Sequence, residues 1–443
     1  MGNTNSCVRH LQDVFSVWMG RSSEAGDVAG SAAEDAASSS SPHLANPSAS
    51  NLVGEVPAES VKQQIQQSMS HWSQLTEFDS ACIDEDVEAD NMKVFLALQS
   101  DPSTRDFFRT FGYDTEVWKS DGSLEIGHKF AEGGQAELFH AKVTWWDSED
   151  NEWDREHGRE WVLKVFKKGT RLRHLQSQWP HGMLKFQEEE YANWRSPTPK
   201  TIPRFFCEVF RGTMLEDGRF AFLMKKEHLD LRRLIDDKMK LLSINNCGPF
   251  SKKVAEEMMF EVALGMSWLH SRDIVHRDLK ASNVLVEVHE DGQFWCLVAD
   301  YECSIGVVGT GLFRAPEILE ACREKSVCKR PSNRPELFTM ASDVYSYGMT
   351  CYEILTGKLP FDGHQGNDLM DAVIGGKRPE VPQYVEEWVH RLLSDCWQND
   401  PANRPSFGEM VNLIYSNSLR IRELVDDRSY EVEEMDWIKL EVE

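Results

Sequence analysis

The feature that most constrains this chain is a short polar loop set between apolar runs. Asp278, Lys280 and Asn283 lie in this loop, and the apolar run 284–286 follows it directly. A second acidic residue, Asp300, ends the next apolar run. A fold for this chain must therefore bury the apolar runs and still bring these four polar side chains together.

The four residue types suit phosphoryl transfer, because that reaction asks a protein mainly to place a hydroxyl group and to neutralise charge. Asp278 would orient the hydroxyl and accept its proton, and Lys280 would contact the phosphate. Asn283 and Asp300 would hold Mg²⁺. At this point the sequence resembles the protein kinases, whose H-R-D-L-x-x-x-N loop is present at 276–283 without a substitution. A chance polar loop is the alternative, and the further matches below disfavour it.

Composition narrows the choice of compartment and partner. The chain has 443 residues, with 73 acidic against 48 basic ones, so its formal net charge is −25. Such a charge argues against nucleic acid as a partner. The ten cysteines form no C-x-x-C pair, which favours a reducing compartment and buried thiols. No apolar run approaches the ~18 to 20 residues of a membrane span, and we expect no secretory leader.

The first residues match the pattern for lipid attachment. Gly2 follows Met1 and a serine stands at position 6, as in N-myristoylated chains, and Cys7 offers a site for palmitate. We expect residues 1–21 to anchor the protein at the cytoplasmic face of the plasma membrane; without acylation the protein would be cytoplasmic. Residues 22–58 are rich in Ser, Ala, Gly and Pro and are predicted to be a disordered linker.

Residues 59–115 are predicted to be a helical segment. Apolar residues recur at helical spacing over 61–75, and a second helix is expected across 92–98. A third helix is predicted to begin after Pro102, carry three phenylalanines and stop at Gly112. Two roles stay open for this segment: bracing the domain that follows, or regulation and partner binding.

The resemblance to protein kinases extends to a glycine-containing turn at 130–138. Kinases carry G-x-G-x-x-G-x-V at this place, above the ATP phosphates. Gly133 keeps the middle glycine, whereas Ala131 and Ala136 replace the first and third. The resemblance assigns these three residues and Leu138 to ATP binding, and the two alanines put the affinity for ATP in question.

Three further residues complete the nucleotide site that the resemblance implies. Lys164 lies in an apolar strand over 161–166, where an unpaired ammonium group would be costly, so it requires a phosphate or carboxylate partner. We expect that partner to be Glu190 on the next helix, with Glu189 as the alternative. Met224 is predicted to lie at the back of the adenine pocket.

The largest departure from the kinase pattern follows the second acid. Asp300-Tyr301-Glu302 stands where kinases have Asp-Phe-Gly, and Glu302 removes a glycine that normally lets the backbone turn. Thr310 together with Lys280 resembles the serine/threonine type of kinase.

Later matches extend over the second half of the chain. The resemblance implies that Asp343 braces the backbone of the polar loop and that Arg404 pairs with Glu317. We hypothesise that Arg277 lacks a phosphate partner. An inserted basic loop at 321–335 is read either as a solvated insertion or as a site for acidic ligands.

The sequence thus predicts an α+β, two-lobed protein kinase fold, with a small β-rich lobe and a larger helical lobe, over residues 124–414. An acidic tail follows at 415–443. The implied activity is ATP- and Mg²⁺-dependent phosphorylation of serine or threonine in protein substrates, in membrane-associated signalling, and the chain looks most like the plant tyrosine-kinase-like group. The alternative is a pseudokinase scaffold, favoured by the three departures from the pattern: Ala131, Ala136 and Glu302.

Overall fold

The computed structural model describes most of the chain between residues 87 and 426, and all of the described residues belong to one compact unit. The described ranges are 87–102, 104–105, 107–111, 122–146, 160–172, 205–227, 229–241, 248–288, 294–301, 309–323, 335–362 and 367–426. The predicted anchor, the linker and the helix at 61–75 lie outside these ranges. No described helix combines the length and the hydrophobicity that a bilayer crossing requires.

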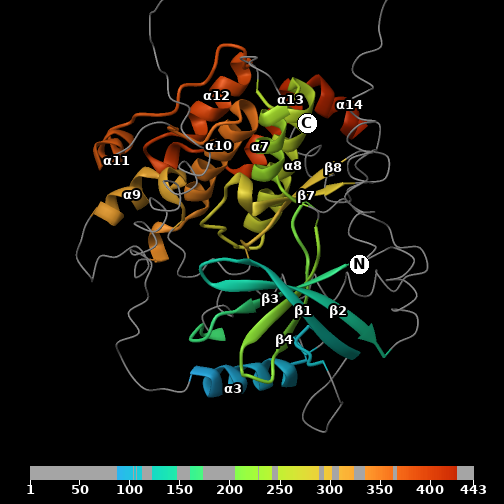
Figure 1. The fold of residues 1–443 in the computed structure, drawn as a ribbon. Helices are drawn as coiled ribbons and strands as arrows, with labels where there is room; N and C mark the ends of the chain where they lie inside the picture. Colours follow the sequence, from blue (N-terminus) through green and yellow to red (C-terminus); the bar gives the residue numbers. More distant parts are fainter. Residues whose placement is uncertain are drawn as a thin grey trace, which may run out of the picture. The chain divides into compact units, whose positions relative to one another are not determined.

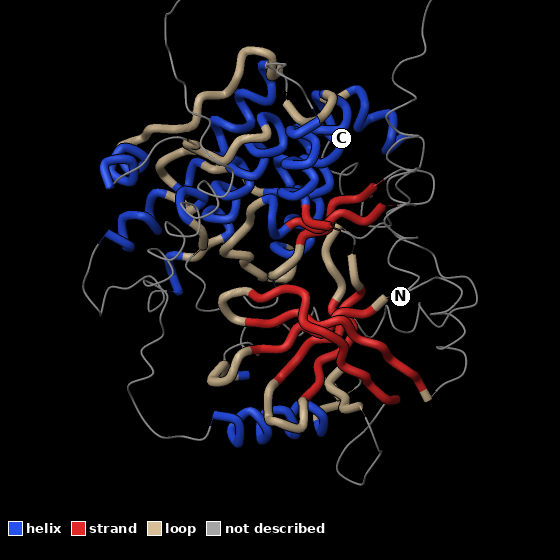
Figure 2. The backbone as a smooth tube through the Cα atoms, viewed as in Figure 1, coloured by secondary structure: helices blue, strands red, loops and turns tan. Residues whose placement is uncertain are grey.

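A five-stranded antiparallel sheet forms the first part of the unit, here called the sheet region (Figures 1 and 2). Its strands, in spatial order, are β1 (Gly122–Glu132), β2 (Ala136–Trp145), β3 (Trp161–Phe166), β5 (Phe220–Lys225) and β4 (Val209–Met214). β3 lies at the centre and all six of its residues are buried, which explains its nearly continuous apolar sequence. Trp145, Trp161, Leu163 and Phe210 build the apolar core on one face of the sheet.

Helix α3 (Val87–Ser100) packs against this sheet and confirms the helix predicted at 92–98. Asn91 is buried and bonds the main chain just after β3: its Nδ2 donates to the Thr170 oxygen (2.8 Å), and its Oδ1 accepts from the Leu172 amide (2.7 Å). The buried Phe95 contacts Phe108 edge to face. The helix therefore holds the main chain where it leaves the central strand.

The helix predicted after Pro102 is wrong. The described residues of 101–111 make turns and then pair in parallel with β4, where the Arg109 amide donates to the Gly212 oxygen and the Gly212 amide donates to the Phe107 oxygen (both 3.1 Å). A Cβ at Gly212 would lie 2.7 Å from the Phe108 ring, so this glycine makes room for the ring. Burial of the two phenylalanines against the sheet thus overrides their helical spacing.

The second part of the unit, here called the helical region, contains a small three-stranded sheet and a group of helices (Figure 1). The small sheet has the order β6 (Leu229–Asp230), β7 (Val284–Val288) and β8 (Phe294–Val298). The helices are α7 (Leu231–Leu241), α8 (Lys252–His270), α9 (Pro316–Arg323), α10 (Met340–Thr356), α11 (Asn367–Ile374), α12 (Glu387–Cys396), α13 (Phe407–Asn417) and α14 (Leu419–Asp426). Short 3-10 turns lie at Ala281–Asn283, Gly311–Phe313, Pro335–Leu337 and Pro401–Asn403.

Helix α10 lies at the centre of the helical region. Nearly all of its side chains are buried, polar ones included, and it packs on α7, α8 and α12. A helix buried on all sides can present its few polar groups to the interior, where they must find partners.

The packed structure continues beyond the residues that resemble kinases. The Ser418 hydroxyl donates to Glu256 Oε2 on α8 (2.6 Å), and Ile421 on α14 is fully buried. Residues 427–443, the greater part of the predicted acidic tail, lie outside the described ranges.

Candidate active site

A buried histidine fixes the conformation of the polar loop. His276 is 0% exposed; its Nδ1 accepts from the Asp278 amide (3.3 Å), so the proton lies on Nε2, which donates to the Ala299 oxygen (2.8 Å). Both ring nitrogens are therefore satisfied in the neutral form. The imidazole ties the polar loop to the end of β8, one residue before Asp300.

Asp343, from α10, braces the same loop as the sequence predicts. Its Oδ2 accepts from the His276 amide (2.7 Å) and its Oδ1 accepts from the Arg277 amide (2.8 Å). A third donor, His270 Nε2, lies 3.0 Å from Oδ2. Arg277 adopts a φ of 69°, a left-handed conformation that is costly for a side-chain-bearing residue. The buried carboxylate of Asp343 accounts for the stability of this turn.

A second carboxylate on α10 also holds the loop, and the sequence analysis missed it. Glu353 Oε2 accepts from the Ala281 amide (3.0 Å), and Oε1 pairs with Arg232 Nη1 on α7 (3.0 Å). Burial raises the pKa of Glu353, while the Ala281 amide and Arg232 act in the opposite direction. The available signal was an acid within the mainly apolar stretch 349–355.

An ammonium group and a hydroxyl group contact the proposed catalytic acid, Asp278. Asp278 Oδ2 accepts from Lys280 Nζ (2.8 Å), and Oδ1 accepts from the Thr310 hydroxyl (2.6 Å). Lys280 Nζ also lies 2.6 Å from the Thr310 oxygen. The sequence analysis used Thr310 only to indicate the type of kinase, and its contact with Asp278 is a finding of the structure. A carboxylate with a lysine beside it can both orient a hydroxyl and contact a phosphate.

Lys164 has the carboxylate partner that its burial requires. Its Nζ lies 2.8 Å from Asp300 Oδ1, and the side chain of Asp300 is 56% exposed, so it also faces solvent. The Lys164 ammonium lowers the pKa of Asp300, which stays ionised. The partners expected from the sequence, Glu190 and Glu189, lie outside the described residues.

The structure brings together the two residues proposed to hold the metal. The Ala299 amide donates to the main-chain oxygen of Asn283 (2.9 Å), and Asp300 follows Ala299 directly in the chain. Asn283 Nδ2 donates to the main-chain oxygen of Asp278 (2.8 Å), which leaves the side-chain oxygen Oδ1 of Asn283 to ligate a cation. Within the described ranges no cluster of three or more histidine, cysteine or acidic side chains could hold a metal by itself. One carboxylate and one amide oxygen fit Mg²⁺, which keeps waters and takes further ligands from phosphates.

The glycine-containing turn is the tip of the β1–β2 hairpin. The Gly133 amide donates to the Ala136 oxygen (2.8 Å) and closes the tip, while Ala131 pairs with Leu138 in the ladder. Leu138 in turn lies opposite Lys164 on β3. Since directly paired residues share a face of the sheet, the turn and the lysine belong to one side of the sheet region.

The connection from the sheet region to the helical region begins at Met224 on β5, which is buried. Lys225 pairs with Glu287 on β7, and Lys226 Nζ lies 2.5 Å from Glu160 Oε2. Each lysine of this basic pair thus has a carboxylate partner. The pairing across to β7 joins the two regions beside the proposed adenine site.

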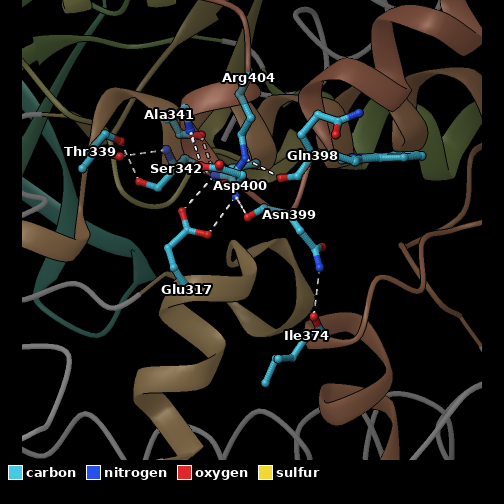
Figure 3. A network of polar contacts seen from close by, with 12 residues as sticks. Glu317, Thr339, Ala341, Ser342, Ile374, Gln398, Asn399, Asp400 and Arg404 are labelled. Atoms are coloured by element: carbon cyan, nitrogen blue, oxygen red, sulfur yellow. Dashed lines mark hydrogen bonds and ion pairs between the residues drawn. The ribbon is translucent and has the colours of Figure 1, made fainter.

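Arg404 pairs with Glu317 as the sequence predicts. Nη1 lies 2.8 Å from Oε1 and Nη2 lies 2.8 Å from Oε2, a bidentate arrangement that Figure 3 shows. The same guanidinium donates to the main-chain oxygens of Ala341, Gln398 and Asn399. This network joins the start of α9 to the turn before α13.

Arg277, the other arginine of interest, lies over the ring of Phe338, 5.0 Å from its centroid. Burial lowers the pKa of its guanidinium, and Nε makes no hydrogen bond within the described residues. That Arg277 lacks a phosphate partner stays a prediction. Of the basic loop expected at 321–335, helix α9 takes the first residues, through Arg323, and 324–334 lie outside the described ranges.

Comparison with known proteins places this site in a family. Residues 221–414 match the family of protein tyrosine and serine/threonine kinases. The chain is 32% identical over 225 residues to a light-sensor protein kinase of Ceratodon purpureus, 46% of this chain and 17% of that protein. It is also 32% identical over 192 residues to the serine/threonine-protein kinase STY17 of Arabidopsis thaliana, 41% of this chain and 30% of that protein.

The chain therefore carries a protein kinase domain, matched from β5 into α13. Its distant relatives include plant serine/threonine kinases. A tyrosine kinase receptor of Drosophila melanogaster is 32% identical over 164 residues, 35% of this chain and 20% of the receptor, so identity at this level does not separate the two specificities. The chain spans less than a third of the length of these relatives.

Proposed function

We propose that this protein is an ATP- and Mg²⁺-dependent kinase that transfers the γ-phosphate to serine or threonine in protein substrates. The observation that carries the proposal is the contact of Asp278 with Lys280 and Thr310, together with the Lys164–Asp300 ion pair. These groups supply an acceptor for the hydroxyl proton and cations for the phosphates.

Each residue has a distinct task in this reaction. Asp278 orients the substrate hydroxyl and takes its proton, and Lys280 neutralises charge on the transferred phosphoryl group. Asn283 and Asp300 would hold Mg²⁺, which when bound draws negative charge from the phosphates. Lys164 holds Asp300 in place in the structure and would also reach the nucleotide phosphates.

Preference for serine and threonine is supported by Lys280 and Thr310. Both side chains contact the Asp278 carboxylate, and Lys280 Nζ lies 2.6 Å from the Thr310 hydroxyl oxygen. The kinase resemblance links this pair of residue types to serine/threonine specificity.

The test is a phosphorylation assay on the purified full chain with radiolabelled ATP and Mg²⁺, followed by phosphoamino-acid analysis. We expect phosphoserine or phosphothreonine, and we expect Asp278→Asn and Lys164→Met each to lose about 10²- to 10⁴-fold in kcat/KM. Exposed Lys240→Met on α7 serves as the matched control and should keep full activity.

Two outcomes would refute the proposal. Equal labelling by the wild type and Asp278→Asn would indicate a contaminating kinase. Phosphotyrosine as the main product would overturn the specificity while leaving the kinase activity in place.

A scaffold without catalysis is the second candidate. Ala131 and Ala136 in the hairpin and Glu302 after Tyr301 favour it, because the family has glycine at all three positions. Against it stands the pairing of Asp300 with Lys164, while the buried Tyr301 directs its hydroxyl to the Cys207 oxygen. A scaffold has no chemical need for this arrangement of charges.

We further propose that the protein is anchored at the cytoplasmic face of the plasma membrane by acyl groups on Gly2 and Cys7. The support is the sequence at positions 1–7, since one myristoyl chain gives marginal binding and a second acyl group makes it stable. Gly2→Ala should move the protein from the membrane to the soluble fraction. Unchanged membrane retention would refute acylation as the anchor.

A further inference from the structure

A buried tyrosine follows the proposed metal ligand. Tyr301 is 2% exposed, and its hydroxyl donates to the main-chain oxygen of Cys207 (2.9 Å). Where kinases have phenylalanine, this chain therefore has a side chain that packs in the interior and also makes a specific hydrogen bond. A buried hydroxyl is tolerated only with such a partner, so the bond fixes the position of the ring.

The segment that accepts this hydrogen bond is itself held firmly. The Cys207 amide donates to the Val298 oxygen (2.7 Å) and the Val298 amide donates to the Phe205 oxygen (2.9 Å), which adds 205–207 as a short parallel partner beside β8. Helix α8 also packs closely against this segment, since a Cβ at Gly265 would lie 2.1 Å from the Phe205 oxygen. The hydroxyl of Tyr301 is thus bonded to a rigid part of the framework.

The residue between these fixed points has an uncommon main-chain conformation. Asp300 has a φ of 65°, in the left-handed region that few residues other than glycine, asparagine and aspartate adopt. On one side the Ala299 amide is bonded to Asn283, and on the other side Tyr301 is bonded to Cys207. These two bonds flank Asp300 directly and hold the main chain on either side of it.

We propose that Tyr301 is a positioning residue: its hydrogen bond to Cys207 fixes the main chain after Asp300 and thereby directs the Asp300 carboxylate to Mg²⁺ and Lys164. The family has glycine at the next position, where this chain has Glu302. The Tyr301 hydrogen bond fixes the main chain as far as residue 301. This inference rests on the proposed function, because it assigns Asp300 to the metal.

The chain offers a matched control for the experiment. Tyr347 on α10 is also fully buried, and its hydroxyl donates to the Met259 oxygen, again at 2.9 Å. Tyr301→Phe and Tyr347→Phe each remove one hydroxyl and one hydrogen bond to a main-chain oxygen. Both variants keep the ring, so both should fold and should lose similar thermal stability.

The readout is binding of a non-hydrolysable ATP analogue by titration calorimetry, with and without Mg²⁺, and the Mg²⁺ concentration for half-maximal phosphorylation. For Tyr301→Phe we expect the affinity for the ATP analogue to fall about two- to tenfold when Mg²⁺ is present and to stay unchanged when it is absent. This range corresponds to the loss of one neutral hydrogen bond. We expect the Mg²⁺ requirement to rise by a similar factor. Tyr347→Phe should match the wild type in both measurements.

The inference is overturned if Tyr301→Phe binds the Mg²⁺-analogue as the wild type does, or if both variants are weakened equally. These results are distinct from failure of the proposed function. If the wild type binds the Mg²⁺-analogue but transfers no phosphate, the kinase proposal fails while the calorimetry still decides the role of Tyr301. If the wild type binds no nucleotide, both proposals are overturned.

Discussion

The two halves of the proposed active site are built in opposite ways. The polar loop at 276–283 is held by buried carboxylates on α10, which accept hydrogen bonds from the main-chain amides of the loop. The hairpin of β1 and β2 is held by its own ladder and by the pairing of β2 with β3, and nearly all of β1 is exposed. Lys129 pairs there with Glu132 and Glu137 at the surface.

The difference suits the two tasks of a kinase. Groups that act where charge develops gain most when they are fixed before the reaction, because no reorganisation is then needed. A nucleotide must enter and leave under the hairpin, which favours an element with few buried contacts. We therefore expect substitutions of the α10 carboxylates that hold the polar loop to affect both folding and catalysis. Substitutions in the hairpin should affect nucleotide affinity alone.

The largest effect should come from Asp343→Ala. The substitution leaves buried donors without an acceptor, so we expect the free energy of unfolding to fall by about 3 to 5 kcal/mol and activity to be lost. Urea denaturation measures the first effect. Asp237→Ala, an exposed acid on α7, is the control and should change stability by less than about 0.5 kcal/mol. A mild effect at Asp343 would show that the loop does not depend on its bracing.

Glu353→Gln should give a smaller, pH-dependent effect. Glutamine can still accept from the Ala281 amide and has no charge to bury, so we expect Glu353→Gln to match the wild type at low pH and to be the more stable of the two near pH 7.

The sign of the pH dependence follows from the raised pKa of Glu353. The folded state holds the proton more tightly than the unfolded state, so this contribution to stability is largest at low pH and falls as the pH rises through the folded pKa. Glutamine does not titrate. The stability of the wild type relative to Glu353→Gln should therefore fall with rising pH, as thermal unfolding of both proteins would measure, and a difference independent of pH would contradict the assignment.

In the hairpin, Ala131→Gly should act on the nucleotide and not on the fold. Restoring the first glycine lets the main chain approach the phosphates, and we expect the KM for ATP to fall by about two- to fivefold with kcat unchanged. The same change in kcat as in KM would show that the hairpin takes part in the chemical step.

The smallest effect is expected at Lys129→Ala. Both of its ion pairs are exposed, and such pairs contribute little because water and salt screen them. We expect no measurable change in the urea midpoint at low or high salt. A clear loss would mean that the hairpin is braced as firmly as the polar loop.

The parts of the fold that the sequence predicted are those with local patterns. The strand at 161–166 and the helix at 92–98 follow from local apolar patterns, and the structure has both of them. The Arg404–Glu317 and Asp343 contacts followed from the kinase resemblance. A local pattern also produced the error after Pro102, because aromatic residues at helical spacing pack equally well as a turn and a bridged segment.

The contacts that the sequence did not predict join distant residues. Glu353 meets Ala281 across 72 residues, and Tyr301 meets Cys207 across 94. Nothing in the local sequence marks such a pair before the chain has folded. Thr310 lies between these two groups of predictions. The sequence pointed to this threonine as a mark of the type of kinase, but its contact with Asp278 could be seen only in the folded structure.

The contacts of α3 have a practical consequence for anyone who makes shorter recombinant fragments. A fragment cut where the kinase resemblance begins, at residue 124, would lack the helix and the phenylalanines that cover Gly212 and would remove Asn91 from the main chain after β3. Such a fragment would expose aromatic side chains and would tend to aggregate. The shortest fragment that folds stably should therefore start before α3, well upstream of the residues that resemble kinases.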